Sequence, residues 1–353
     1  FVAQSEGLAV VERAGRVGVM DRTGALVVPM RFEEGGEHHE GLAYAALDGR
    51  YGYIDARGNT AIPFTFDRAG TFHHGLAVVE REGRSGAIDT RGHVVVPFGH
   101  DWIEGFDRGV SRVRRDGRMG LIGPFGDTVL APVHAHVGSF LGGPALVVDG
   151  DRCGYVDRQG RWVVAQELEA PAGIITWGEF RDGVAVVQVK GKRGAIDSTG
   201  RFIIPAQYVD VGVHAGGLIA VKKKNKWAYA DRSHKLVTEA KYDQAWPLVQ
   251  GLGRVVVENR WGAIDSTGRE VIPPRYDALD DAVHGILVAR EGGRSGAVSG
   301  KGAVLVPFEF EQVEPLTADL VRVDRAGRMA YFKPSAGRMI WKEEGFDLPA
   351  SPQ

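Results

Sequence analysis

Apolar and polar residues alternate along the chain in short runs, and turn-forming residues separate these runs at regular distances. The pattern is clearest at residues 258–277, ENRWGAIDSTGREVIPPRYD, where three valines precede a Glu258-Asn259 turn and an apolar strand resumes at Trp261. Weaker copies fill the chain at steps of 34 residues, except for one step of 40. Aligned on Gly262, the copies share one column: Gly18, Gly52, Gly86, Gly120, Gly154, Gly194, Ala228, Gly262, Gly296 and Ala330. The sequence therefore predicts ten tandem β repeats in an all-β fold.

A second turn recurs in these copies, and its aspartate has a structural explanation. In Asp265-Ser266-Thr267-Gly268 the carboxylate can accept backbone N–H bonds, and the glycine can adopt the left-handed conformation that closes the turn. The same spacing recurs at Asp21, Asp55, Asp89, Asp157 and Asp197. We therefore interpret these aspartates as turn formers and not as catalytic carboxylates.

The aligned glycine column predicts tight packing. Gly262 shares a strand face with an apolar residue two positions later, so a backbone or a large side chain is expected where its Cβ would lie. Ala228 and Ala330 should mark slightly looser copies. Pro273 is expected to end the following short strand, because proline lacks the N–H of a continuing ladder, and the ring of Tyr276 should then cover the apolar edge.

Ten β repeats can form a closed ring or an open array. Closure removes exposed sheet edges, so we expect residues 1–346 to form one array closed into a β-propeller-like ring. Two five-repeat rings and an open β superhelix are the alternatives. Six extra residues within 167–180 mark either a seam between half-arrays or a longer loop, and we expect residues 347–353 to be a disordered tail.

Composition narrows the range of partners. The chain has 43 basic and 45 acidic residues, a net charge of -2, so no general attraction to nucleic acid is expected. No apolar run approaches the ~20 residues that cross a bilayer, which predicts a soluble chain without a membrane span. Cys153 is the single cysteine, which excludes an internal disulfide and is compatible with either the cytosol or export.

The Trp261-Gly262-Ala263-Ile264-Asp265 segment, with Gly268 and the IPPRYD motif at 272–277, resembles the WG-containing repeat family of bacterial proteins. The resemblance covers nearly the whole chain, although only Trp227 and Trp261 keep the tryptophan of the family name. It implies a bacterial, mostly β interaction protein, in many members with an export signal, and it implies no catalytic residues. The expected location is therefore extracytoplasmic, periplasmic or secreted, with the cytoplasm as the alternative.

Candidate sites are sought where a copy departs from its own repeat, because the shared residues serve folding. Arg112, Arg254 and Arg322 replace an apolar residue on the first strand of a hairpin, opposite the buried face. In a ring they could converge on an anion or an acidic partner. The alternative is three solvated arginines on a half-exposed face.

Three further departures carry side chains that bind ligands in other proteins. Lys222, Lys223 and Lys224 on one hairpin could dock on an acidic surface, a phosphate or a lipid headgroup, or could be a solvated hairpin. Trp102 and Trp177 could stack on a sugar or a peptide, or could be buried under loops. Two pairs of adjacent loop histidines are His38 and His39, and His73 and His74. They suggest a metal site only weakly, because adjacent side chains of an extended chain point apart.

The function that these patterns favour is a non-enzymatic scaffold that binds a protein or peptide. No local enzyme motif occurs, and neither a cofactor nor a metal is expected. The alternative is a module that binds carbohydrate or another cell-envelope ligand. A hydrolase or lyase with a site dispersed over a channel mouth is the third and least favoured reading.

Overall fold

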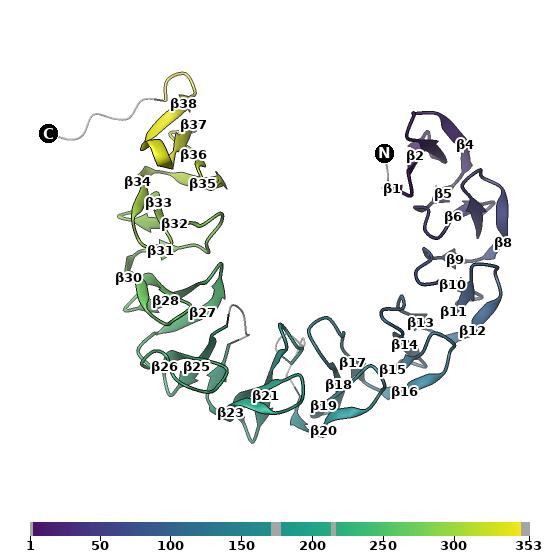
Figure 1. Ribbon diagram of the computed structural model, residues 1–353, viewed down its shortest axis with the longest axis horizontal. Coiled ribbons are helices and arrows are strands. Elements are labelled where there is room, and N and C mark those ends of the chain that lie inside the picture. Colours follow the sequence, from purple (N-terminus) through teal and green to yellow (C-terminus); the bar gives the residue numbers. More distant parts are fainter. Residues whose placement is uncertain (1–2, 171–177, 213–216, 347–353) are drawn as a thin grey trace. The chain divides into compact units, whose positions relative to one another are not determined.

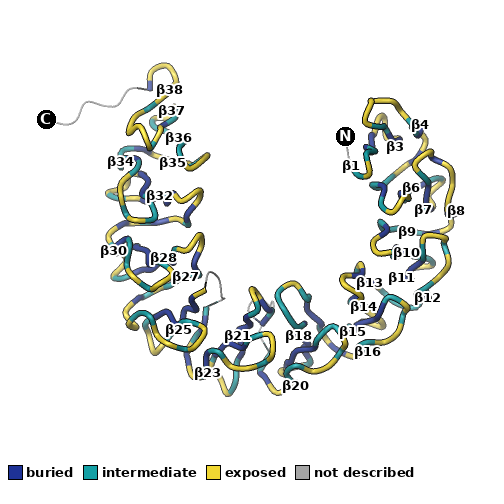
Figure 2. Tube along the Cα trace, viewed as in Figure 1, coloured by how far each residue is buried: buried dark blue, intermediate teal, exposed yellow. Residues whose placement is uncertain are grey.

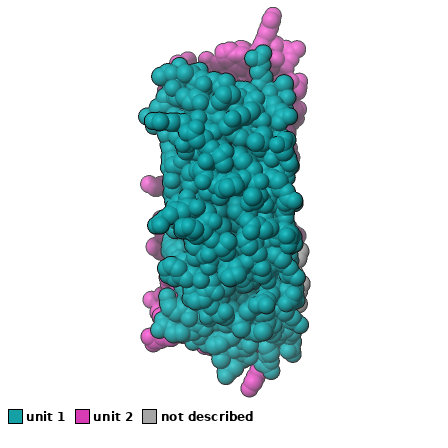
Figure 3. Space-filling model, turned by 90° about the vertical axis from the view of Figure 1, so that its right-hand side faces the viewer, with its two compact units in different colours: residues 1–140, 144–167 teal, residues 141–143, 168–353 magenta. Residues whose placement is uncertain are grey.

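The computed structural model describes residues 3–170, 178–212 and 217–346, so Trp177 and the tail at 347–353 lie outside the described residues. Contacts divide the chain into two compact units, coloured separately in Figure 3. Unit 1 comprises residues 1–140 and 144–167, and unit 2 comprises residues 141–143 and 168–353. The elements are labelled in Figure 1.

Unit 1 is built from consecutive antiparallel strands, and β20 begins within it. The strands are β1 (Ala3–Ser5), β2 (Leu8–Arg13), β3 (Arg16–Asp21), β4 (Leu26–Phe32), β5 (Glu34–Gly35), β6 (Leu42–Leu47), β7 (Arg50–Asp55), β8 (Thr60–Phe66), β9 (Arg68–Ala69), β10 (Leu76–Arg81), β11 (Arg84–Asp89), β12 (Val94–His100), β13 (Trp102–Ile103), β14 (Ser111–Arg115), β15 (Arg118–Ile122), β16 (Thr128–His134), β17 (His136–Val137), β18 (Ala145–Asp149), β19 (Arg152–Val156) and β20 (Trp162–Glu169).

Unit 2 repeats the same order and contains the one helical element of the described residues, a short 3-10 turn. Its elements are β21 (Val184–Val189), β22 (Lys192–Asp197), β23 (Phe202–Tyr208), β24 (Asp210–Val211), β25 (Ile219–Lys223), β26 (Lys226–Ala230), β27 (Gln244–Val249), β28 (Leu252–Val257), β29 (Arg260–Asp265), β30 (Glu270–Tyr276), β31 (Ala278–Leu279), β32 (Ile286–Glu291), β33 (Arg294–Ser299), β34 (Val304–Phe310), β35 (Gln312–Thr317), β36 (Leu320–Arg325), β37 (Arg328–Lys333), η1 (Pro334–Ala336) and β38 (Arg338–Lys342).

Each regular repeat is a four-stranded antiparallel meander such as β31-β32-β33-β34. A short first strand is followed by a tight hairpin and a longer third strand of the predicted pattern. In the hairpin of β28 and β29 both turn residues have positive φ, 49° at Glu258 and 60° at Asn259, the conformation whose twist matches paired strands. The all-β repeat fold predicted from the sequence is confirmed.

The recurring aspartate turns, which we call Asp turns, form as expected. Asp265 Oδ1 accepts the N–H groups of Thr267 at 2.9 Å and Arg269 at 3.1 Å, and Gly268 closes the turn with φ 85°. Bonds from the hydroxyl and N–H of Thr267 lower the pKa of Asp265. The same geometry recurs at Asp21, Asp55, Asp89, Asp157, Asp197 and Asp231. These carboxylates are used in folding.

The aligned glycines face backbone, as predicted, and the backbone belongs to the third strand of the same repeat. A Cβ on Gly262 would lie 2.4 Å from the carbonyl oxygen of Ile272. The two alanines of the column occur in repeats whose third strand is missing or paired in another register. Beside Ala228 no regular third strand forms, and Ala330 pairs with Lys342 in a different register. Both alanines are at most 1% exposed, and looser packing around them stays a prediction.

Pro273 does not end its strand, contrary to the sequence-based expectation. It lies within β30, and the register between β29 and β30 shifts between Trp261 and Ala263, directly opposite the proline segment. At this bulge the ladder requires no N–H, so proline is tolerated inside the strand. The bulge also brings the backbone of β30 against Gly262.

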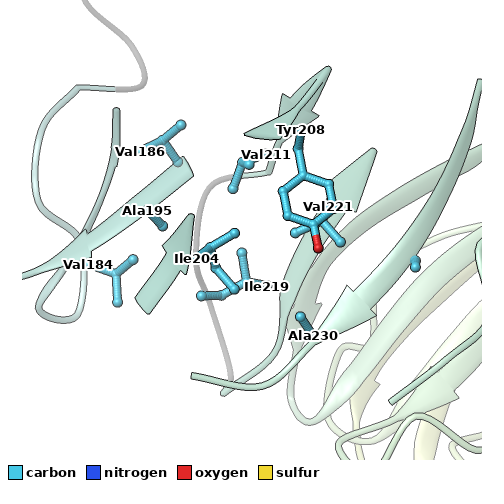
Figure 4. Close-up of a cluster of buried hydrophobic side chains, with 10 residues drawn as sticks. Val184, Val186, Ala195, Ile204, Tyr208, Val211, Ile219, Val221 and Ala230 are labelled. Carbon is cyan, nitrogen blue, oxygen red and sulfur yellow. The ribbon is translucent and has the colours of Figure 1, made fainter. Parts of the chain in front are cut away.

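The core lies between successive sheets. Figure 4 shows one such cluster, in which Val184, Ala195 and Ile204 from β21 to β23 face Ile219, Val221 and Ala230 from β25 and β26. The ring after the proline segment is buried in the same way, with Tyr276 1% exposed. Buried residues occupy the middle strands of each repeat, and exposed ones its turns (Figure 2). Ring closure stays a prediction, because each sheet of the described residues is open at both edges.

Candidate functional site

A carboxylate ties the hairpins of successive repeats together, an arrangement that we call the carboxylate clip. Asp243 accepts a hydrogen bond from Lys226 Nζ at 2.5 Å. It also accepts one from the N–H of Glu258, in the next hairpin turn, at 2.8 Å. The ammonium group of Lys226 and the N–H of Glu258 lower the pKa of Asp243. The clip recurs at Glu33, Asp67, Asp101 and Asp277, each 17 residues after its base.

The clip is not apparent within any single turn of the sequence, although a signal for it exists. The base stands two residues before the aligned glycine column, and the acid follows the buried ring of the same repeat, as Asp277 follows Tyr276. A search for opposite charges at a fixed separation of 17 residues would have found the pairs. Their partners in the next turn, such as the N–H of Gly292, are visible only in three dimensions.

At the junction of the sixth and seventh repeats the clip position holds Val209, which is 50% exposed. The base of this junction is Lys192, and the turn N–H that a carboxylate would accept belongs to Lys224. Neither the Lys192 ammonium group nor the Lys224 N–H has a hydrogen-bond or ion-pair partner among the described residues. The two groups that elsewhere share a carboxylate therefore face solvent here.

The two hairpins are nevertheless adjacent, because other contacts hold them. Arg193 Nη1 donates to Asp210 Oδ1 at 2.5 Å, and Asp210 pairs with Lys222 in the sheet of the seventh repeat. The N–H of Val209 donates to the carbonyl oxygen of Lys222 at 3.0 Å. Lysines from both turns thus lie along one edge of unit 2.

We call this edge the basic edge and define it as Lys190, Lys192, Lys222, Lys223 and Lys224. All except Lys222 are exposed, and the ammonium group of Lys222 lies 5.7 Å from the ring centroid of Trp227. Residues 181–241 contain 12 basic and 5 acidic residues in a chain whose net charge is -2. Asp197 and Asp231 of this segment are held in Asp turns. The positive charge of the edge is therefore weakly balanced locally.

The three predicted arginines already have acidic partners. Arg112 on β14 donates to both carboxylate oxygens of Glu104, at 2.7 and 2.5 Å, and Arg254 on β28 contacts Asp281 at 2.7 Å. Arg112 also donates to the carbonyl oxygen of Val137 at 3.2 Å, and Arg254 to that of Leu279 at 3.0 Å, each 25 residues further on. Arg322 on β36 contacts Asp324 at 3.1 Å. The bonds to the carbonyl oxygens of Val137 and Leu279 join neighbouring sheets, whereas the Arg322 contact lies within β36.

The alternative of solvated arginines on a half-exposed face is wrong for Arg112 and Arg254. Their side chains are 20% and 17% exposed, because the sheets on both sides of a repeat cover its middle strands. Leu146 and Val186, at equivalent positions, are buried. Arg322 is 42% exposed. Arg112 lies in unit 1 and the other two lie in unit 2, so convergence on one anion stays a prediction.

Trp102 and the predicted histidines differ in how far they are exposed. Trp102 lies on β13 and is 37% exposed, which leaves part of its indole accessible. His38 is buried at 1% exposure, in the position that Phe72 fills in the next repeat, and burial lowers its pKa. His39 contacts Glu37 at 3.2 Å, and its ring centroid lies 5.1 Å from that of His73.

Described residues include no group of three or more metal-ligating side chains, and His74 lies in an exposed turn. Of these four histidines, only His38 is buried. Cys153 is buried, and burial raises the pKa of its thiol to about 11, so it is a poor nucleophile at neutral pH. No helix in the described part of the chain is long and apolar enough to span a bilayer.

Comparison with known proteins identifies the repeat. Seven segments match the family described as WG containing repeat, at residues 18–51, 51–84, 86–118, 154–192, 194–227, 228–261 and 261–294. The chain therefore belongs to this family, as its tryptophan-glycine motif suggested. No curated protein matches the chain.

Solved structures resemble the chain only distantly, with TM-scores of at most 0.36 for the three that follow. A eukaryotic initiation factor has a TM-score of 0.36 at 10% identity, over 84% of this chain and 93% of that one. PorZ, a surface component of the type-IX secretion system of Porphyromonas gingivalis, has a TM-score of 0.26 at 9% identity, over 91% and 53%. Hsv2p of Kluyveromyces lactis has a TM-score of 0.30 at 10% identity, over 64% and 89%.

Proposed function

We propose that the protein is a non-enzymatic scaffold that binds a protein or peptide partner. The observation that carries the proposal is that some polar groups are used in contacts within the array and others face solvent. The periodic polar groups, in the Asp turns and the carboxylate clips, are consumed by contacts within and between repeats. The basic edge departs from the period and presents its charged groups to solvent. A surface of this kind is suited to recognition and contains no nucleophile, base and acid arranged for catalysis.

A peptide-display selection on the immobilised full chain tests this function. We expect enrichment of related peptides whose binding survives competition with the free protein, because a repeat surface presents fixed side chains at a fixed spacing. Purified chain that enriches no peptide, and that retains no protein from a lysate of its native host, would contradict the scaffold function.

Carbohydrate binding is the second candidate, and the accessible indole of Trp102 favours it. Aromatic rings bind sugars by contact with their apolar faces. Binding of the wild-type chain to a glycan array, abolished by Trp102→Ala, would support it. A blank array would leave the peptide scaffold as the sole candidate of the two.

The closed ring and the extracytoplasmic location are parts of the same proposal. The ring is supported by the tandem repeats, and the location by the expectation attached to the family. Fluorescent labels at Ala14 and Ala326, in the exposed hairpin turns of the first and tenth repeats, would be close together in solution if the repeats form one ring and far apart in an open superhelix. Cell fractionation of the native host tests the location directly.

A further inference from the structure

The junction of the sixth and seventh repeats holds a base and a turn N–H arranged for a carboxylate that the chain itself does not provide. At the equivalent junction, Asp243 satisfies Lys226 and the N–H of Glu258 together, which fixes what the arrangement binds. At Val209 the corresponding groups are Lys192 and the N–H of Lys224. A charge-assisted pair of donors of this kind favours a carboxylate over a neutral acceptor.

We propose that the basic edge binds an acidic segment of a partner protein, one of whose carboxylates occupies the clip position beside Val209. This inference rests on the proposed scaffold function and specifies its partner. The neighbouring lysines Lys223 and Lys224 supply charge for further carboxylates of the same segment. Trp227, held beside Lys222, supplies an aromatic surface next to the charged groups.

The surroundings of the basic edge favour a short acidic peptide over a long uniform polyanion. Glu169 accepts the N–H of Gly191 at 3.0 Å on one side of the edge, and Asp243 with the exposed Glu258 follows on the other. Outside residues 181–241 the chain carries 31 basic and 40 acidic residues. A nucleic acid or an anionic membrane extending past the edge would therefore meet repulsion, whereas a segment with a few carboxylates would not.

A second junction without a clip acid shows that an apolar residue at the clip position does not by itself leave a junction without a carboxylate. Ala135 takes the clip position between the fourth and fifth repeats. The adjoining hairpin supplies its own acid there, because Asp149 accepts the N–H of Ala135 at 2.8 Å and contacts His134 at 2.6 Å. The junction at Val209 differs in having lysines where that hairpin has aspartate.

Fluorescence anisotropy on the full chain tests the proposal. The probes are a labelled peptide of about twelve residues that alternates Glu and Ser, and the same peptide with Gln in place of Glu. We expect the Glu peptide to bind at least about tenfold more tightly, with affinity falling between about 50 mM and 300 mM salt as screening increases. The triple variant Lys192→Gln, Lys223→Gln, Lys224→Gln should lose about tenfold in affinity.

Val209→Asp is the sharper variant, because it removes no lysine. It restores the carboxylate of the other junctions, and we expect it to weaken binding of the Glu peptide by about fivefold. The matched control Arg57→Gln, Arg91→Gln, Lys301→Gln changes the net charge as much as the triple variant does, at exposed turns elsewhere. It should bind like wild type, and circular dichroism should show all variants folded.

Equal binding of the two peptides, an unchanged affinity of Val209→Asp, or an equal loss in the control variant would each overturn the proposal. Tighter binding of a DNA oligonucleotide or an anionic vesicle of similar charge would overturn it as well. If peptides selected by display bind while the Glu peptide does not, the acidic segment is wrong and the scaffold function stands. If no peptide binds, both fail.

Discussion

Replacing Gly262 by alanine tests the account of the aligned column, in which backbone of the third strand leaves no room for a Cβ. The added carbon would lie 2.4 Å from the carbonyl oxygen of Ile272 and 2.7 Å from the backbone nitrogen of Pro274. Both atoms belong to backbone that is held by pairing with β29, so the contact cannot be relieved by a rotamer change. The bulge of β30 must move outward instead.

The cost follows from what that movement disrupts. Overpacking costs about 1–3 kcal/mol, and weakening one or two ladder bonds beside the bulge adds about 1 kcal/mol each. Alanine restricts the unfolded chain and returns about 0.4–1 kcal/mol. We therefore expect Gly262→Ala to lower the free energy of unfolding by about 2–4 kcal/mol.

Urea unfolding followed by circular dichroism measures the loss, and native-state hydrogen exchange locates it. The amides of β29 and β30 should lose protection first, since neighbouring repeats interact only locally. Gly99→Ala is the matched control, because no atom lies within 4 Å of its built Cβ. The reasoning is refuted if Gly262→Ala is as stable as Gly99→Ala and the amides of β30 keep their protection.

Three further predictions concern stability and metal binding. The pKa values of the Asp-turn carboxyl groups are lowered in the folded state from 3.8. The stabilisation that these carboxylates give is therefore present above about pH 4 and is lost as the pH falls below it, so the midpoint of thermal unfolding should fall between pH 6 and pH 2. Tyr53→Phe removes a buried 2.7 Å bond to the carbonyl oxygen of Gly70 and should cost about 1–2 kcal/mol in urea unfolding, whereas an unchanged midpoint would contradict that bond's role. Calorimetric titration with Zn²⁺ should show no stoichiometric uptake, and uptake lost in His39→Ala would refute this.

Local features of the fold could be predicted from the sequence because each is encoded within a few residues. The Asp265 turn needs only the aspartate and Gly268 three positions later, and the Glu258-Asn259 hairpin needs only two residues tolerant of positive φ. The burial of Tyr276 followed from its place at the end of an apolar strand.

Contacts between strands and repeats could not be predicted in the same way. The rule that proline ends a strand failed at Pro273, because a bulge removes the need for its N–H. Arg254 was expected on a half-exposed face, and only the packing of a second sheet explains its burial. Lys222, Lys223 and Lys224 of the basic edge were identified from the sequence, whereas the significance of Val209 required the geometry of the Asp243 clip.

The carboxylate clip also bears on how a tandem array can acquire new specificity. Each clip connects one hairpin to the next and no further, so exchanging its acid alters a single boundary. A duplication followed by one substitution could therefore convert an internal fastening into an attachment point for another molecule while the neighbouring copies keep their folds.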